Sequence, residues 1–164
     1  MTAVIYTRAP NRLGKLISQP GGKRRDQAIA DSEAALEKIR PELLAEIDEA
    51  LAQLGDLVAK AAAEIEPRLE VYARARTIVG FAGLCEKQAL GTVAFSLCDL
   101  CDHYIEAGVW NAAAVGAHIQ TMGVLRIANL PEDSPEAAAV MDGLKTLVRR
   151  AEEKAAAEAS AAQA

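Results

Sequence analysis

Apolar residues recur at steps of three and four along most of this chain, which is the spacing of one face of an α-helix. Prolines and glycines interrupt the pattern at intervals and mark the expected helix ends. We therefore predict an all-α fold, a helical bundle of about five to six helices with long antiparallel members. The predicted helices cover 23–39, 41–66, 68–88, 89–107, 110–128 and 135–157.

The longest apolar stripe begins just after Pro41. Pro41 removes a backbone donor and restricts Arg40, so one helix should end there and the next should begin. The stripe suits one side of an intramolecular bundle, a helical hairpin or the seam of a homodimer, and we expect the first of these. Its members, interrupted by a kink at Pro67, are Leu43, Ile47, Leu51, Leu54, Val58, Ala61, Ile65, Leu69, Tyr72, Arg76 and Val79.

Turn residues divide the chain into three parts. The sequence Gln19-Pro20-Gly21-Gly22 predicts a turn or hinge, because Pro fixes one backbone angle and Gly permits positive ones. We expect an irregular arm over 1–22, a bundle over 23–157 and a frayed tail over 158–164. Gly108 should end one helix, and Ser134 followed by Pro135 should begin the last.

Composition supports the helical prediction. Apolar residues make up 51% of the 164 residues and aromatic residues only 4%, so Ala, Leu, Val and Ile must fill the core. Such a core is typical of helix bundles, and Ala, Glu and Leu lose little freedom in a helix. A chain of this length forms one domain with a real core.

The charge is unevenly distributed. The net charge is −5, yet residues 1–25 carry six basic residues and no acidic one. The cationic arm can bind an acidic protein surface, whereas the acidic remainder disfavours nucleic acid as a partner. A short helical face within the arm would add apolar contacts. The predicted partner-binding residues are Arg8, Arg12, Leu13, Lys15, Leu16, Ile17, Lys23, Arg24 and Arg25.

Sequence features also bear on the compartment. The N-terminus lacks the apolar run of a secretory signal, and no segment is long and apolar enough to span a bilayer. The odd number of cysteines indicates reduced thiols, so we expect a cytoplasmic protein. The acid-free, Arg-bearing start also resembles an organelle transit peptide, although Pro10 and Pro20 would cut short its amphipathic helix.

Cys98 and Cys101 have the spacing of a metal or redox pair. A closed zinc site needs two further ligands, and the sequence offers no second pair of Cys or His. His103 lies about 200° around a helix from Cys101. We therefore expect the cysteines to pack in the core, and we predict neither a metal site nor a cofactor.

His103 and His118 are the two histidines. An exposed His103 could accept a phosphoryl group, but Asp99 and Glu106 share its helix face and would repel one. No basic residue follows it at the spacing that phosphotransfer domains use. His118 falls among apolar positions, where a hydrogen-bonded core or interface histidine is expected. Phosphotransfer at His103 is therefore the alternative hypothesis.

Enzyme motifs are missing from the sequence. It contains no Gly-rich phosphate loop before a helix, no Gly-x-Ser-x-Gly and no His-Glu-x-x-His. Glu86 and Gln88, which could suggest a helical phosphatase, lie two residues apart and do not share a helix face. We therefore predict a protein that is not an enzyme.

The N-terminal third resembles a known family. The order Asn11-Arg12-Leu13, Lys15-Leu16, Pro20-Gly21-Gly22, Ala34-Ala35-Leu36 and Ile39-Arg40-Pro41 is similar to the CheE proteins of α-proteobacterial chemotaxis operons. The resemblance implies a cytoplasmic, non-catalytic accessory of chemotaxis signalling, with a receptor, kinase or response regulator as partner. We thus predict an adaptor that docks through its arm.

Overall fold

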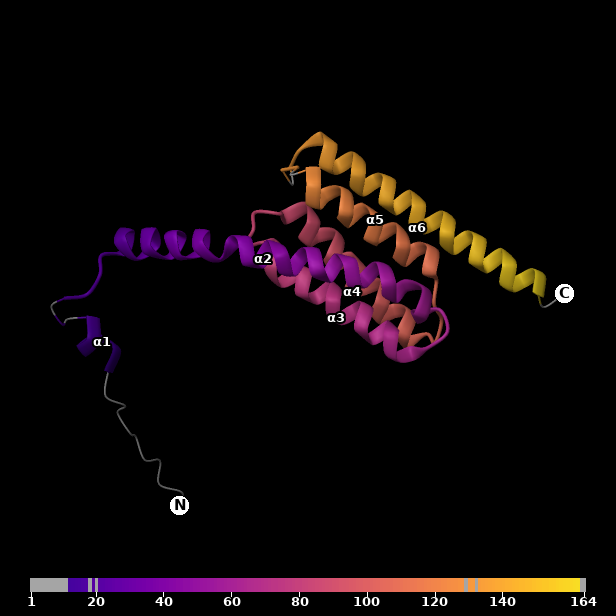
Figure 1. Cartoon of the computed structure of the whole chain (residues 1–164), viewed down its shortest axis with the longest axis horizontal. Coiled ribbons are helices and arrows are strands. Elements are labelled where there is room, and N and C mark those ends of the chain that lie inside the picture. The colour runs from indigo at the N-terminus through magenta and orange to yellow at the C-terminus, as the bar shows by residue number, and fades with distance from the viewer. Residues whose placement is uncertain (1–11, 18, 20, 129, 132, 163–164) are drawn as a thin grey trace, which may run out of the picture. The chain divides into compact units, whose positions relative to one another are not determined.

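A computed structural model describes residues 12–17, 19, 21–128, 130–131 and 133–162. Within these residues the chain forms six helices and no strand, which confirms the predicted all-α fold (Figure 1). The helices are α1 (Arg12–Ile17), α2 (Arg25–Ala61), α3 (Ile65–Ala82), α4 (Gln88–Glu106), α5 (Ala112–Ala128) and α6 (Pro135–Ala162).

The chain divides into two compact units, residues 1–38 and 39–164, and the boundary lies inside α2. The first unit contains α1 and the start of α2. A turn lies between them, as predicted, with Gly21 at φ 102°, a value that favours glycine. Pro20 of the predicted turn and residues 1–11 lie outside the described residues.

The predicted helix break at Pro41 is wrong, because α2 continues through this residue. A proline inside a helix removes one backbone hydrogen bond and costs roughly 3 kcal/mol. The segments on either side are rich in Ala, Leu and Glu, which favour the helix. Burial of Ile47 and Leu54, both 0% exposed, further stabilises the second half of α2.

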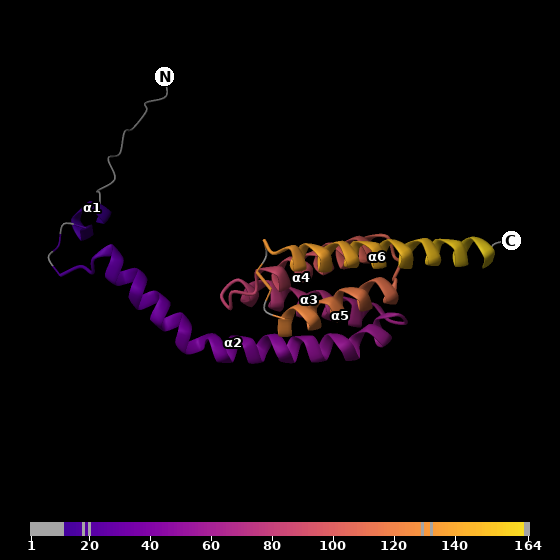
Figure 2. The same ribbon diagram turned by 90° about the horizontal axis from the view of Figure 1, so that it is seen from above.

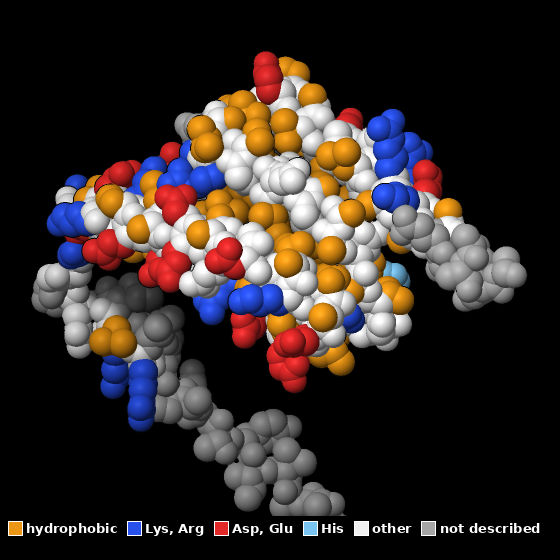
Figure 3. Space-filling view, turned by 45° about the vertical axis from the view of Figure 1, so that its right-hand side comes forward, with side chains coloured by type: hydrophobic (Ala, Val, Ile, Leu, Met, Phe, Trp, Pro, Cys, Tyr) orange, Lys and Arg blue, Asp and Glu red, His pale blue; other side chains and the backbone are white. Residues whose placement is uncertain are grey.

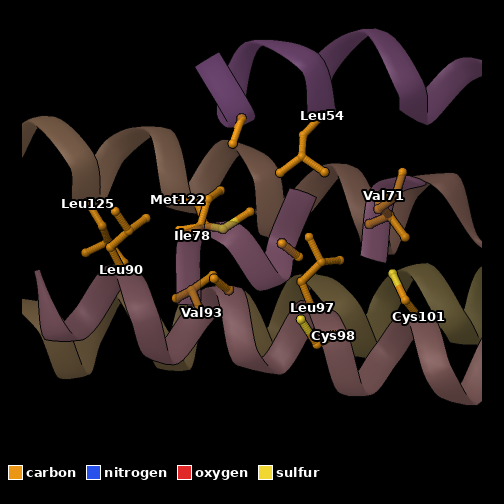
Figure 4. Close-up of a cluster of buried hydrophobic side chains, with 14 of the residues drawn as sticks. Leu54, Val71, Ile78, Leu90, Val93, Leu97, Cys98, Cys101, Met122 and Leu125 are labelled. Carbon is orange, nitrogen blue, oxygen red and sulfur yellow. The ribbon is translucent and has the colours of Figure 1, made fainter. Parts of the chain in front are cut away.

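The second unit is a bundle formed by α2 from residue 39 onward and by α3 to α6. Short turns join the helices, and successive helices run in opposite directions (Figures 1 and 2). Helix α3 packs on α4, α4 on α5 and α5 on α6. Figure 4 shows Leu54, Ile78 and Met122, from three helices, in one buried cluster. The core is therefore shared by the whole bundle.

Ion pairs join α2 to the rest of the bundle. Arg40 Nη2 donates to Glu86 Oε1 at 2.9 Å, and Arg126 Nη2 of α5 donates to Asp48 Oδ2 at 2.9 Å. The arginine lowers the pKa of the Glu86 carboxyl. Glu86 itself has φ 56° in the turn between α3 and α4. The contact with Arg40 helps to hold this left-handed residue in place.

Several helix ends agree with the sequence. Helix α4 ends at Glu106, and Gly108 follows at φ 68° while Val109 N donates to Tyr104 O at 3.0 Å. Ser134 Oγ accepts the Ala137 N–H at 3.1 Å and caps α6. This last helix continues to residue 162, five residues beyond its predicted end.

Only the α2 part of the long apolar stripe faces the core. On α2 its members are buried or half-buried, as expected. On α3, Ile65 is 62% exposed and Leu69 52% exposed, so the prediction of a continuous core stripe is wrong there. The core face of α3 instead comprises Pro67, Val71, Ala75, Ile78 and Ala82. A turn over 62–64 separates the helices and breaks the register before Pro67, which lies in the first turn of α3.

Candidate functional site

A groove of about 420 Å³ lies between α4, α5 and α6 and brings both histidines to one place. Cavities of this volume are large enough for a small ligand or a partner side chain. Apolar and charged residues alternate along its walls. The lining residues are Ser96, Asp99, Leu100 and His103 of α4, His118 of α5, and Met141, Leu144, Lys145, Val148, Arg149 and Glu152 of α6.

His118 is the buried polar residue of the groove, with 2% of its surface exposed. Its Nδ1 lies 2.9 Å from the carbonyl oxygen of Ala114, and its Nε2 lies 3.2 Å from Ser96 Oγ. A carbonyl can only accept, so Nδ1 carries the proton and neutral Nε2 accepts from the serine hydroxyl. Burial lowers the pKa of His118. The predicted hydrogen-bonded core histidine is confirmed.

His103 is exposed on α4 and borders the same groove. Asp99, which the sequence places on the same helix face as His103, also borders the groove. The structure adds Lys145 and Arg149 from α6, which the sequence did not connect with His103. Lys145 pairs with Asp142 at 3.2 Å and Arg149 with Glu153 at 4.0 Å, and both pairs are exposed contacts within α6. Such pairs are weak and can be exchanged for an incoming anion.

The sequence did not predict that Ser96, Lys145 and Arg149 line the same groove as the histidines. They lie on two helices and far apart along the chain, so no local motif relates them. Only the spacing along α4 could have predicted part of the site. Ser96, Asp99 and His103 follow one another at steps of three and four, so they share a helix face. The position of α6 across the groove follows only from the packed structure.

The three cysteines are buried free thiols, at 4%, 6% and 0% exposure for Cys85, Cys98 and Cys101. Burial raises the pKa of Cys98 to about 11 and that of Cys101 to about 12. The thiolate is the reactive and metal-binding form, so these residues are suited to packing. The prediction that Cys98 and Cys101 pack in the core is confirmed. Among the described residues, no three His, Cys, Asp or Glu side chains form a potential metal site.

The predicted partner-binding residues fall in the N-terminal unit. Lys23 bonds Asp31, which lowers the pKa of that carboxyl, with a further contribution from Gln27. Arg25 pairs with Asp26 at 3.4 Å. Acidic residues at the start of α2 thus compensate part of the positive charge. Arg12, Lys15, Leu16 and Arg24 are exposed, whereas Arg8 and the side chains of Leu13 and Ile17 lie outside the described set.

A scan against protein-family models, a search of curated proteins and a search of solved structures each returned no match. No described helix is long and apolar enough to cross a membrane. The resemblance to the CheE proteins stays a prediction.

Proposed function

We propose that this protein is a helical adaptor that docks a protein partner through its N-terminal unit. The observation that carries the proposal is the exposure of this unit. None of its described residues is buried. Even its apolar side chains are exposed, Leu16 at 62% and Ile29 at 49%. Most helical stability in proteins comes from packing of an apolar face, and residues 25–38 of α2 bury none of theirs, so binding of a partner to these side chains would stabilise the segment.

The charges of the arm indicate the chemistry of that partner. Arg12, Lys15 and Arg24 are exposed, so an acidic protein surface would complement them. Together with the N-terminal resemblance, this favours a cytoplasmic role as a non-catalytic accessory of chemotaxis signalling. Its partner would be a component of the two-component machinery.

Deleting residues 1–22 tests this proposal. We expect the deletion to abolish partner capture from native cells while leaving helical content and melting temperature nearly unchanged, because the core begins at Ile47. Quantitative mass spectrometry would compare the proteins retained by three baits. These are the full chain, the deletion variant, and a variant with Arg12, Lys15 and Arg24 changed to Glu. Circular dichroism would follow the folding of each variant.

Matched controls separate the arm from charge in general. Changing Arg74 of α3 and Arg150 of α6 to Glu alters exposed basic residues on the bundle outside the groove and should leave capture intact. Capture by the full chain should weaken as salt is raised, because exposed charges are screened. Retention of the same partners by the deletion variant, or a large fall in its melting temperature, would refute docking through the arm.

A second candidate function is phosphotransfer at His103, and the groove favours it. Lys145 and Arg149 border the groove opposite His103, so cations from α6 can offset the repulsion by Asp99. An unprotonated ring nitrogen of His103 would attack the phosphorus of a phosphoaspartate. The P–O bond would break and the aspartate would leave as a carboxylate.

Incubation with a phosphorylated response regulator tests this alternative. The expected result is acid-labile label on the protein, lost in His103→Gln and reduced at least about tenfold when Lys145 and Arg149 are changed to Gln. His118→Gln is a matched control and should keep the label, because this ring is buried. The absence of label on folded wild-type protein would exclude phosphotransfer and leave the adaptor proposal standing.

A further inference from the structure

Helix α3 carries a second apolar stripe that the bundle leaves exposed at its N-terminal end and covers only in part at Tyr72 and Val79. Two of its large members, Ile65 and Leu69, are 62% and 52% exposed. The core face of the helix lies about 120° away around its axis. Steps of four and three alternate along the stripe, which is the heptad spacing of helices that pair along their length. The members are Ile65, Leu69, Tyr72, Arg76, Val79 and Gly83.

Glycines on this face leave room for another helix. At Gly80 and Gly83, no atom lies within 4 Å of where a Cβ would be. Glycine in a helix is less favourable than alanine by up to about 1 kcal/mol, and the monomer makes no use of the space. A helix packed against the stripe could approach closely at both positions. Exposed apolar side chains also gather on the face of the bundle shown in Figure 3.

The shape of the surface changes along α3. At the N-terminal end, Ile65 and Leu69 are exposed large side chains. At the C-terminal end, a shallow hollow of about 360 Å³ is lined by Val79, Gly83 and Phe95, with Gly91 of α4 beside them. Projecting side chains thus lie at one end of the stripe and a hollow at the other, so an antiparallel copy of α3 would fit both ends at once.

We propose that the α3 stripe forms an antiparallel interface between two copies of this chain. In this register Ile65 packs over Gly83 of the second copy, and Leu69 packs against Val79 of the second copy. Every contact occurs twice about the two-fold axis, as an isologous interface requires.

The centre of the interface pairs a cationic side chain with an aromatic ring. Arg76 lies opposite Tyr72 of the second copy, where its guanidinium can stack on the ring. Within one chain Arg76 already lies 5.9 Å from the Tyr72 ring centroid, so the side chain needs only to turn toward the other ring. A hollow of about 440 Å³ lined by Tyr72, Gly80 and Phe81 would receive these side chains. The interface does not depend on the proposed docking function.

Sedimentation equilibrium of the full chain tests the proposal. We expect dimers at about 100 µM protein, and we expect Leu69→Glu and Val79→Glu each to weaken dimerisation at least about a hundredfold. Leu147→Glu, at an exposed leucine of α6, is the matched control and should remain dimeric. Circular dichroism should show that all three variants are folded, and Leu69→Ala provides a milder change. Monomeric wild-type protein, or dimers unaffected by both glutamates, would overturn the proposal.

Cysteine cross-linking tests the direction of the helices. Copper(II)–phenanthroline, which passes the two electrons of the thiols to dissolved oxygen, should join a Leu69→Cys chain to a Val79→Cys chain by a disulfide. Leu69→Cys alone should cross-link poorly, because residue 69 lies opposite residue 79 in the antiparallel register. The buried native cysteines keep the background low, which wild-type protein would check. Efficient cross-linking of Leu69→Cys alone would show a parallel arrangement and contradict the proposed register.

Discussion

Replacing Leu97 with alanine is expected to lower the free energy of unfolding by about 2–5 kcal/mol. Leu97 is 0% exposed on α4, the helix that packs against both α3 and α5. Figure 4 shows it directed into the cluster that contains Leu54 and Val71. Close-packed neighbours cannot fully collapse onto the space left by the deleted carbons, so lost burial and a cavity both contribute. Urea unfolding followed by circular dichroism would measure the change.

The matched control is Leu147→Ala on α6. This leucine is 50% exposed, so its truncation should change stability by about 0.5 kcal/mol or less. Equal effects at the two leucines would contradict the assignment of Leu97 to the core. A loss of cooperativity in the Leu97→Ala transition, seen as a reduced slope, would show instead that the denatured or native state had changed in compactness.

The helices were predictable wherever one apolar face met one core. On α4, the apolar residues Leu90, Val93, Leu97 and Cys101 follow one another at steps of three and four, and all are buried. Their spacing was decisive because a core on one side of a helix selects residues three and four apart. Gly108 was equally informative, since its positive φ is a local property that does not depend on the rest of the fold.

Helix α3 shows where the same reasoning fails. Two apolar faces run along it, one through Ile78 and one through Leu69, and spacing alone cannot say which faces the core. The longer stripe continues the register of α2, and for this reason the spacing favours it. The turn at 62–64 breaks this register, and so the other face packs inward. At Pro41 the sequence predicts a helix end that the structure lacks. The flanking segments favour the helix by more than one internal proline costs.

The groove could be predicted only in part. The exposure of His103 and the burial of His118 followed from their neighbours along one helix each. The hydrogen bond between His118 and Ser96 depends on how α4 and α5 cross, and the approach of Lys145 depends on α6. Such contacts arise from packing between helices distant in sequence. They explain why no local sequence motif contains the residues of the groove.

Acidification is expected to destabilise the protein through His118. Its folded pKa lies below the value of 6.5 for a free histidine, so the unfolded chain binds a proton that the folded chain resists. The stability contributed by this group is complete above pH 6.5 and is lost as the pH falls below that value. Between pH 6.5 and the lower folded pKa, the free energy of unfolding should fall by up to about 1.4 kcal/mol per pH unit. Urea titrations at about pH 7.5 and about pH 5.5 would measure the fall.

His118→Gln should flatten this pH dependence, because glutamine does not titrate. The variant will be less stable at neutral pH if it loses the bond to Ser96, so the difference between the two pH values is the informative quantity. His103→Gln is the matched control, since the second histidine of the groove is exposed and should leave the fall unchanged. The exposed carboxyls of Asp31 and Glu86, whose pKa values are lowered, titrate well below this window. If the free energy of unfolding falls equally in wild-type protein and in His118→Gln, a group other than His118 causes the acid sensitivity.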